Sequence, residues 1–386
     1  MSYETYRVAD LIDEIAMGPF GSNIKVSCFV DSGVPVLNGS NLEGFSLSEK
    51  AFRFVTKEKA DSLNKANAHR GDIVITHRGT LGQIAFIPQD SRYDRYVISQ
   101  SQFRVRCNDK VLPEYLVYYF HTPIGQHKLL SNASQVGVPA LARPSSTFQQ
   151  IEVVLPELSI QKRVVEIIST IQKKIANNQE LNENLYDQML TIFNNARDTA
   201  SWNRRKLSDV LTFFDNLRKP LSSIQREKME HIYPYYGATS IVDYVEDYLF
   251  EGTYILVSED GANVVDPAGH PLTQYTHGKF LVNNHEHIVK GTNGYSEALV
   301  YALLGTLNMQ SIVTGAAQPK INQANLRNFE AVLPESNEAQ ELSNILNPML
   351  QQMILNDQEN ERLSALRDTL LPQLMSGLFD ISGIEL

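Results

Sequence analysis

The segment VVLPELSIQKRVVEIISTIQKKIANNQELNENLYDQMLTIFNN, residues 153–195, decides the architecture of this 386-residue chain. Apolar residues within it recur in alternating steps of four and three, from Val164 through Ile175 to Ile192. This spacing is the a and d seam of a heptad repeat, and no proline interrupts residues 157–200. The segment therefore predicts one long helix that pairs with another helix.

A second copy of this segment follows later in the chain. Residues 154–156, Val-Leu-Pro, are matched by the same three residues at 332–334, an offset of 178 that continues for about 40 residues. At this offset, apolar Val164 aligns with apolar Leu342. The chain is therefore predicted to contain an internal duplication in which each copy is a globular unit followed by a long helix.

Two details of the second copy are less regular. Pro348 lies near its start, so we expect it to delay or kink the second helix, and Arg367 occupies a seam position. An amphipathic helix on the surface of an ordinary domain is the simpler alternative, but the length and the duplication favour a coiled coil. The predicted segments are a first globular unit at 1–156, a central helix at 157–200, a second globular unit at 201–334 and a C-terminal helix at 335–386.

Both seams carry two asparagines at equivalent places. Asn178 and Asn182 lie in the first helix, and Asn356 and Asn360 in the second. An amide in a seam costs stability but fixes the register and orientation of the helices. If the helices pair antiparallel about a pseudo-two-fold axis, Asn178 is expected near Asn360, and Asn182 near Asn356.

Each globular unit has the pattern of a mixed fold. Segments 72–76, 103–106 and 253–257 have the β-branched or alternating residues of strands. Helical patterns are fewer, chiefly at 113–121 and 296–307. The predicted fold class is α+β, with two similar mixed α/β domains that have curved sheets, separated by two long antiparallel coiled-coil helices in a pseudo-two-fold repeat.

The composition is that of a globular protein with an acidic excess. The chain carries 34 Lys and Arg against 44 Asp and Glu, a formal net charge of −10. Residues 335–386 hold 2 basic and 9 acidic side chains, whereas residues 1–156 hold 16 and 15. This balance argues against indiscriminate binding of polyanions, although a few local cations, helped by a partner, can still read nucleic acid.

Cysteine content and hydropathy indicate the compartment. Cys28 and Cys107 are too few for a disulfide framework or a cysteine zinc site. No apolar run approaches the roughly 20 residues that cross a bilayer, and the first residues lack the pattern of a signal peptide. We therefore expect a cytoplasmic protein that does not contact a membrane.

Catalytic motifs are missing from the sequence. It contains no Gly-x-x-x-x-Gly-Lys-Ser/Thr phosphate loop, no Phe-x-Gly-x-Gly cofactor loop, no Asn-Pro-Pro-Tyr motif and no Asp/Glu-x-Lys nuclease pair. We therefore expect neither enzyme activity, nor a cofactor, nor a metal. Two alternatives stay open: a metal-dependent hydrolase that uses His285 and His287 as zinc ligands, and a coiled-coil scaffold that does not read DNA.

A series of short strings runs through both units in a fixed order. They are GPFGSNIK (18–25), PVLNGSN (35–41), GDIVITHRGTLGQIA (71–85), VLPELSIQ (154–161), YPYYGATSIVDYVEDYLFEG (233–252), LVSEDGAN (256–263) and GKFLVNNHEHIV (278–289). In this order, and with the duplicated helices, the chain resembles the DNA-specificity subunit of type I restriction-modification systems. The resemblance covers essentially the whole sequence.

The resemblance implies a binding subunit without catalytic activity. Two target-recognition domains would each read one half of a bipartite double-stranded DNA site. Two S-adenosylmethionine-dependent modification subunits would dock on the chain to methylate adenines, and two ATP-dependent restriction subunits would join for cleavage. This implication agrees with the missing motifs, and two similar units on a rigid spacer suit a bivalent reader.

The candidate DNA-contacting residues follow from side-chain chemistry. Arg, Asn and Gln can read base edges, Lys, Arg, Tyr and Ser can hold phosphates, and all of them must be exposed. Asn283, Asn284, His285 and His287 are interpreted as exposed donors and acceptors that contact a polar ligand. The full set is Asn38, Asn41, Arg78, Gln100, Gln102 and Arg143 in the first unit, and Tyr235, Tyr236, Lys279, Asn283, Asn284, His285 and Lys320 in the second.

Overall fold

The computed structural model describes residues 3–134, 137–238, 240–315 and 318–379. The chain forms two compact units. The first unit contains residues 1–174 and 362–386, and the second contains residues 175–361. Each unit therefore combines one mixed α/β region with a part of each long helix.

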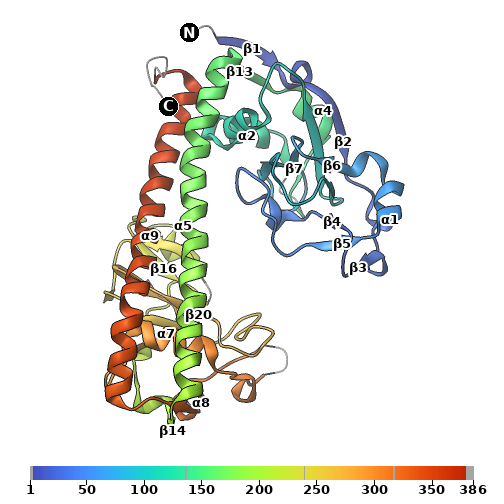
Figure 1. Ribbon diagram of the computed structural model, residues 1–386. Coiled ribbons are helices and arrows are strands. Elements are labelled where there is room, and N and C mark those ends of the chain that lie inside the picture. Colours follow the sequence, from blue (N-terminus) through green and yellow to red (C-terminus); the bar gives the residue numbers. More distant parts are fainter. Residues whose placement is uncertain (1–2, 135–136, 239, 316–317, 380–386) are drawn as a thin grey trace. The chain divides into compact units, whose positions relative to one another are not determined.

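The two long helices predicted from the heptad pattern are present. Helix α5 spans Leu158–Thr199 and helix α9 spans Ser336–Ser376 (Figure 1). Helix α9 begins upstream of Pro348 and continues through it, so the expected delay of the helix start is wrong. A proline inside a helix costs about 3 kcal/mol, but Leu346 and Leu350 are buried on either side of it, and burial of each contributes about 1.5–3 kcal/mol.

Within the second unit the two helices meet at a polar layer. Asn178 Nδ2 donates a 2.9 Å hydrogen bond to Asn360 Oδ1, and Asn356 Nδ2 donates a 2.7 Å bond to Asn182 Oδ1. From one pair to the other, the residue number rises along α5 and falls along α9, so the helices run antiparallel here. The pairs are those expected from the sequence.

Within the first unit the helices share an apolar core. Val164 and Ile168 of α5 belong to the same buried cluster as Leu371 of α9. Arg367, at a seam position of α9, places its guanidinium carbon 5.3 Å from the centroid of the Phe45 ring. A cation over an aromatic face is attracted to the ring, which accounts for a charged residue at this position of the seam.

The mixed region of the first unit is built on an antiparallel sheet in the order β2-β10-β7-β8 and a five-stranded sheet in the order β3-β5-β4-β9-β6. Both faces of β7 are covered, since Ile73 and Ile75 lie in one core cluster and Val74 lies in another. This double burial explains its uninterrupted apolar run. The elements are β1 (Tyr3–Arg7), β2 (Ile12–Met17), β3 (Phe29–Val30), β4 (Val34–Val36), β5 (Arg53–Val55), β6 (Asn67–His69), β7 (Ile73–Thr76), β8 (Ile84–Phe86), β9 (Arg95–Val97), β10 (Gln102–Cys107), β11 (Ala133–Ser134), β12 (Ala140–Leu141), β13 (Glu152–Pro156), α1 (Lys57–Ser62), α2 (Pro113–His121), α3 (Pro123–Leu130) and α4 (Pro144–Gln150).

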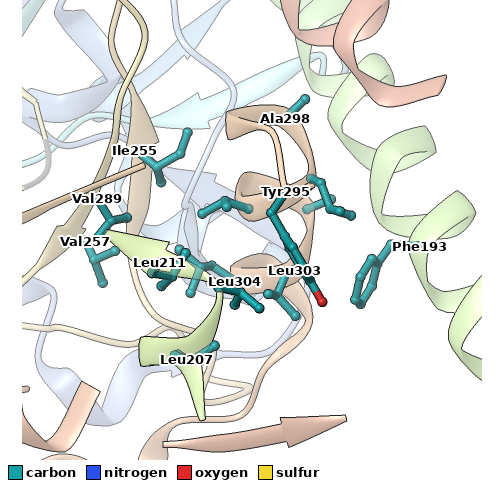
Figure 2. Packing of buried hydrophobic residues seen from close by; sticks show 14 of the residues in the cluster. Phe193, Leu207, Leu211, Ile255, Val257, Val289, Tyr295, Ala298, Leu303 and Leu304 are labelled. Carbon is teal, nitrogen blue, oxygen red and sulfur yellow. The ribbon is translucent and has the colours of Figure 1, made fainter. Parts of the chain in front are cut away.

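The second unit has the same plan. Its antiparallel sheet has the order β15-β22-β19-β20, and a further sheet has the order β17-β16-β21-β18. Figure 2 shows the core, where Val257 and Val289 from the sheet and Leu303 from helix α7 gather with Phe193 from α5. The elements are β14 (Asn203–Lys206), β15 (Leu211–Phe213), β16 (Tyr233–Tyr236), β17 (Ile241–Val245), β18 (Phe250–Glu251), β19 (Ile255–Ser258), β20 (Thr273–Tyr275), β21 (Lys279–Val282), β22 (Glu286–Gly291), β23 (Glu330–Leu333), α6 (Ser223–Arg226), α7 (Glu297–Thr306) and α8 (Gln323–Asn328).

The register of the two sheets makes residues of the two units equivalent. In the first unit Gln102, which begins β10, pairs with Thr76, which ends β7. In the second unit Glu286, which begins β22, pairs with Ser258, which ends β19. The strands and helices expected in both units are confirmed, and the α+β fold class with its internal repeat is confirmed as well.

The long helices are amphipathic rather than apolar all round. In the part of the chain that the structure describes, no helix combines the length and the hydropathy that crossing a membrane requires.

Candidate nucleic-acid interface

In the first unit, several polar candidates gather at one end of the four-stranded sheet. Because β2, β10 and β7 are antiparallel neighbours, the end of β2 at Met17, the start of β10 at Gln102 and the end of β7 at Thr76 lie at the same sheet end. The segments that leave these strands carry Arg78 and Gln100. The topology therefore brings together residues that lie far apart in the sequence.

A cleft of about 750 Å³ opens at this sheet end. Its lining includes Phe20, Lys65, His77, Arg78 and Gln100. Burial lowers the pKa of His77, whose Nε2 lies 3.2 Å from the Gln100 carbonyl oxygen. At neutral pH the positive charge of the cleft therefore comes from Lys65 and Arg78.

Two candidates of the first unit are corrected by the structure. Asn41 and Gln102 are both fully buried, although base readers must be exposed. Asn41 Nδ2 donates to the carbonyl oxygens of Ser48 and Lys50, at 2.9 Å each. Gln102 Oε1 accepts a 2.9 Å bond from the Ser99 backbone N–H. Both side chains hold loops in place.

The other two candidates of this unit lie on the surface. Asn38 is exposed, and its Oδ1 accepts a 2.9 Å bond from the Ser40 backbone N–H, which caps a short helical turn. Arg143 is exposed and has a positive φ of 47°. It lines a separate cavity of about 590 Å³ together with His127 and Lys128. The structure therefore does not bring all the candidates of this unit into one cleft.

The equivalent sheet end of the second unit carries a dense ionic network that the sequence did not predict. His287 is fully buried, with Nδ1 2.6 Å from Asp215 Oδ2 and Nε2 2.8 Å from the Ile321 carbonyl oxygen. Glu259 is hydrogen-bonded to Arg218 and lies 2.9 Å from Lys320 Nζ. The cations and carboxylates of this network neutralise one another.

The network shifts the titration of its acids. Burial by itself would raise the pKa of Asp215, but the hydrogen bond and charge of His287 outweigh it and lower that pKa. Burial acts in the same direction on Glu259, yet the bonds from Arg218 and Lys320 lower its pKa. Both acids are therefore ionised at neutral pH. Such a buried network holds its members in fixed positions.

This geometry bears on the hydrolase alternative. Asp215, Glu259 and His287 bring ligand atoms within 4.8 Å of one another, as a metal site would. Both ring nitrogens of His287 face oxygen acceptors, however, and each acceptor requires an N–H donor. Neither nitrogen offers a lone pair to a metal, and Arg218 and Lys320 already supply positive charge to Glu259. The expectation that His287 is an exposed donor is wrong.

Three further candidates of the second unit lie on β16 and β21. Tyr235 and Tyr236 are buried, with 1% and 6% exposure, so the prediction that they reach DNA is wrong. Lys279 lies over the ring of Tyr248, 4.5 Å from its centroid.

The turn before β22 holds the other candidates. Asn284 is exposed, and Asn283 Oδ1 accepts a 2.8 Å bond from the His285 backbone N–H. His285 Nδ1 faces Asp260. Asn284 and the partly exposed His285 thus lie at the same sheet end as the ionic network.

Comparison with known proteins decides the family. A model of the type I restriction modification DNA specificity domain matches residues 3–186 and again residues 200–365, so the two units each match the same domain. The chain belongs to this family. Members are specificity subunits of type I restriction-modification systems, which are non-catalytic, and this specificity subunit is therefore a DNA-recognition component rather than an enzyme.

Individual relatives agree with this assignment. A candidate type I restriction enzyme specificity subunit of Haemophilus influenzae is 32% identical over 145 residues, which cover 38% of this chain and 36% of that relative. The MjaIX specificity subunit of Methanocaldococcus jannaschii is 20% identical over 95% of this chain and 91% of its own length. The crystal structure of a type I S subunit from M. genitalium has a TM-score of 0.54 at 16% identity, covers 97% of this chain and 96% of its own, and supports the fold.

Proposed function

We propose that this specificity subunit reads a bipartite double-stranded DNA site, one half with each unit. It would direct two S-adenosylmethionine-dependent modification subunits and two ATP-dependent restriction subunits to that site. The observation that carries the proposal is the duplication itself: each unit has a corresponding four-stranded sheet with an equivalent end, and each matches the same DNA specificity domain.

The sheet ends supply the contacts in this proposal. In the first unit, Arg78 and Gln100 line the cleft and have the donor and acceptor groups that read base edges. In the second unit, Asn284 and His285 occupy the turn that leads into β22. Asn38, Arg143, Lys279, Asn283 and Lys320 remain candidates for contacts that position the phosphate backbone.

The charge of the chain predicts how it binds. With a formal net charge of −10, the isolated chain attracts DNA weakly, so tight binding requires partner subunits that supply cations. We expect weak binding by the chain alone and strong, salt-sensitive binding by its complex with the modification subunits. Nanomolar, sequence-specific binding by the isolated chain at physiological salt would contradict this part of the proposal.

Mapping methylated adenines in host DNA tests the function directly. We expect one bipartite motif that disappears when this chain is deleted. Arg78→Ala and Gln100→Ala should relax the motif only in one half, and Asn284→Ala only in the other. Lys110→Ala, beyond the opposite end of β10, is the matched control and should leave the motif unchanged. Methylation that does not depend on the chain, with no sequence-dependent DNA binding by the complex, would favour the scaffold alternative.

A further inference from the structure

We infer that Phe20 is an aromatic stacking residue that contacts the bases of the half-site read by the first unit. The inference rests on the proposed function and adds to it a base contact made through the face of a ring. It starts from the exposure of the ring: the Phe20 side chain is 84% exposed, whereas Phe103 and Phe120 of the same unit are fully buried. The ring lines a cleft that also contains two cations and an amide, so it is accessible to whatever ligand enters that cleft.

The turn that carries Phe20 is fixed rather than loose. The Gly18 N–H donates a 2.8 Å bond to the Gln102 carbonyl oxygen, and the Asn23 N–H donates a 2.8 Å bond to the Phe20 carbonyl oxygen. A Cβ atom at Gly18 would lie 1.9 Å from the Ser99 carbonyl oxygen. Glycine is therefore required at position 18 for the turn to approach the segment before β10 so closely. Because the turn is already ordered, little conformational entropy is lost when the ring binds.

The surroundings of Phe20 fit a nucleic acid better than an apolar protein surface. The same cleft is lined by Lys65, Arg78 and Gln100, two cations and one amide. Cations attract phosphates, amides read base edges, and an aromatic ring can stack on a base where it inserts between two base steps. Apolar side chains such as Leu63 also line the cleft, but an apolar partner would offer no negative charge to its two cations. The cleft combines the three kinds of group with which proteins hold a DNA strand.

The second unit supports the inference independently. The segment after β15 occupies the place in the sheet that the segment after β2 occupies in the first unit. It ends in a short helical turn, Asp215–Leu217, and the Leu217 side chain is 47% exposed. An apolar side chain is therefore presented at the same sheet end in both units. Leucine and phenylalanine are both side chains that proteins insert between base steps.

The test uses the full chain in complex with its modification subunits. The DNA is a duplex whose sequence comes from the methylated-adenine map, with 2-aminopurine placed in turn at each position of the half-site that the first unit reads. Unstacking or stacking on a ring changes the fluorescence of this base. We expect a change at one or two positions with wild-type protein, its loss with Phe20→Ala, and its retention with Phe20→Trp. The affinity of Phe20→Ala should fall about tenfold.

A matched control separates stacking from general loss of apolar surface. Val26 is 82% exposed in the same segment but does not line the cleft. Val26→Ala should keep both affinity and fluorescence change. If Phe20→Ala keeps them too while the wild-type complex binds its site, the inference is wrong and the proposed function stands. If the wild-type complex shows no preference for the mapped site, both fail.

Discussion

The substitution Glu286→Gln should stabilise the second unit, and by an amount that grows with pH. Glu286 begins the central strand of the sheet and is 1% exposed. Its Oε1 accepts a 2.9 Å hydrogen bond from Gln274 Nε2, but Oε2 has no partner among the described residues. Burial raises the pKa of this carboxyl well above its ordinary value, and the bond from Gln274 opposes the rise only in part.

The sign of the pH dependence follows from this shift. The folded state holds the proton of Glu286 more tightly than the unfolded state does, so unfolding releases the proton once the pH exceeds the ordinary value of 4.5. The contribution of Glu286 to the stability of the wild-type protein is therefore greatest below that pH and falls as the pH rises towards the folded pKa. Over this window the fall approaches about 1.4 kcal/mol per pH unit, a large part of a domain stability of about 5–15 kcal/mol. A glutamine does not titrate and is free of this loss.

The single tryptophan of the chain makes the measurement specific to this unit. Trp202 packs in the core of the second unit, 5.6 Å from the Phe193 ring. Urea unfolding followed by its fluorescence should show Glu286→Gln more stable than wild type, with a difference that increases between pH 5 and pH 7. The comparison cancels the contributions of acids that both proteins share, such as Asp215. Glu246→Gln, at an exposed position, is the matched control and should leave the wild-type profile unchanged.

Two results would refute this reasoning. A difference that does not change between pH 5 and pH 7 would mean that Glu286 does not retain its proton in the folded state. A destabilised Glu286→Gln protein at pH 7 would mean that Oε2 accepts a bond which an amide cannot replace. Either result would remove the interpretation of Glu286 as a buried, protonated counterpart of Gln102.

Three further predictions concern the helices and the ionic network. Asn182→Ala removes the acceptor of the 2.7 Å bond from Asn356 and should lower the free energy of unfolding in urea by about 1–3 kcal/mol. Leucine at both 182 and 356 should restore the stability but allow more than one helix register. Mixed cross-links between cysteines engineered into the two helices would show this. Asp215→Asn should destabilise the second unit by about 3 kcal/mol at pH 7, because it leaves buried His287 without its charged partner. The pKa of Asp215 is lowered, mainly by His287 against the effect of burial, so this difference in stability should shrink as the pH falls below about 4. An equal difference at pH 3 in the Trp202 assay would contradict the prediction. Four residues added to each long helix, beside Asn182 and Asn360, lengthen each helix by about 6 Å. The gap in the methylated motif should therefore widen by one or two base pairs while the half-sites stay the same. An active variant with an unchanged gap would show that the helices do not set the spacing of the site.

The fold could be predicted from the sequence where a pattern is long and repeated. The seam from Val164 to Ile192 predicts α5, and the same pattern 178 residues later predicts α9. A heptad repeat this long still indicates a helix when one position, such as Pro348, does not fit. The pairing of Asn178 with Asn360 followed from the duplication together with the expected antiparallel, pseudo-two-fold arrangement of the helices. Such features depend on residues near each other in sequence or related by one constant offset.

The candidate site was predicted less well because it depends on burial and on long-range pairing. Gln102 lies next to Phe103 on a strand whose two faces are both covered, so its polar side chain is enclosed rather than presented. Arg218 was missed because its partner Glu259 lies 41 residues away, and no local pattern joins them. Lys320 was predicted as a DNA-contacting candidate, but its ion pair with Glu259, made from a different loop, was missed for the same reason. Polarity marks a residue as a candidate, but the topology decides whether it reaches the surface.

The two sheet ends share a backbone plan but differ in chemistry, and this difference has a consequence for recognition. Thr76 and Gln102 in the first unit are replaced by Ser258 and Glu286 in the second. The cleft of the first unit carries Arg78, which makes no ion pair within the described residues, whereas the second unit neutralises Arg218 against Glu259. A guanidinium without a carboxylate partner suits the acceptor-rich edge of guanine, while amide and imidazole groups suit other base edges. The half-sites read by two such ends should therefore differ in sequence, and the motif should be asymmetric although the protein is internally duplicated.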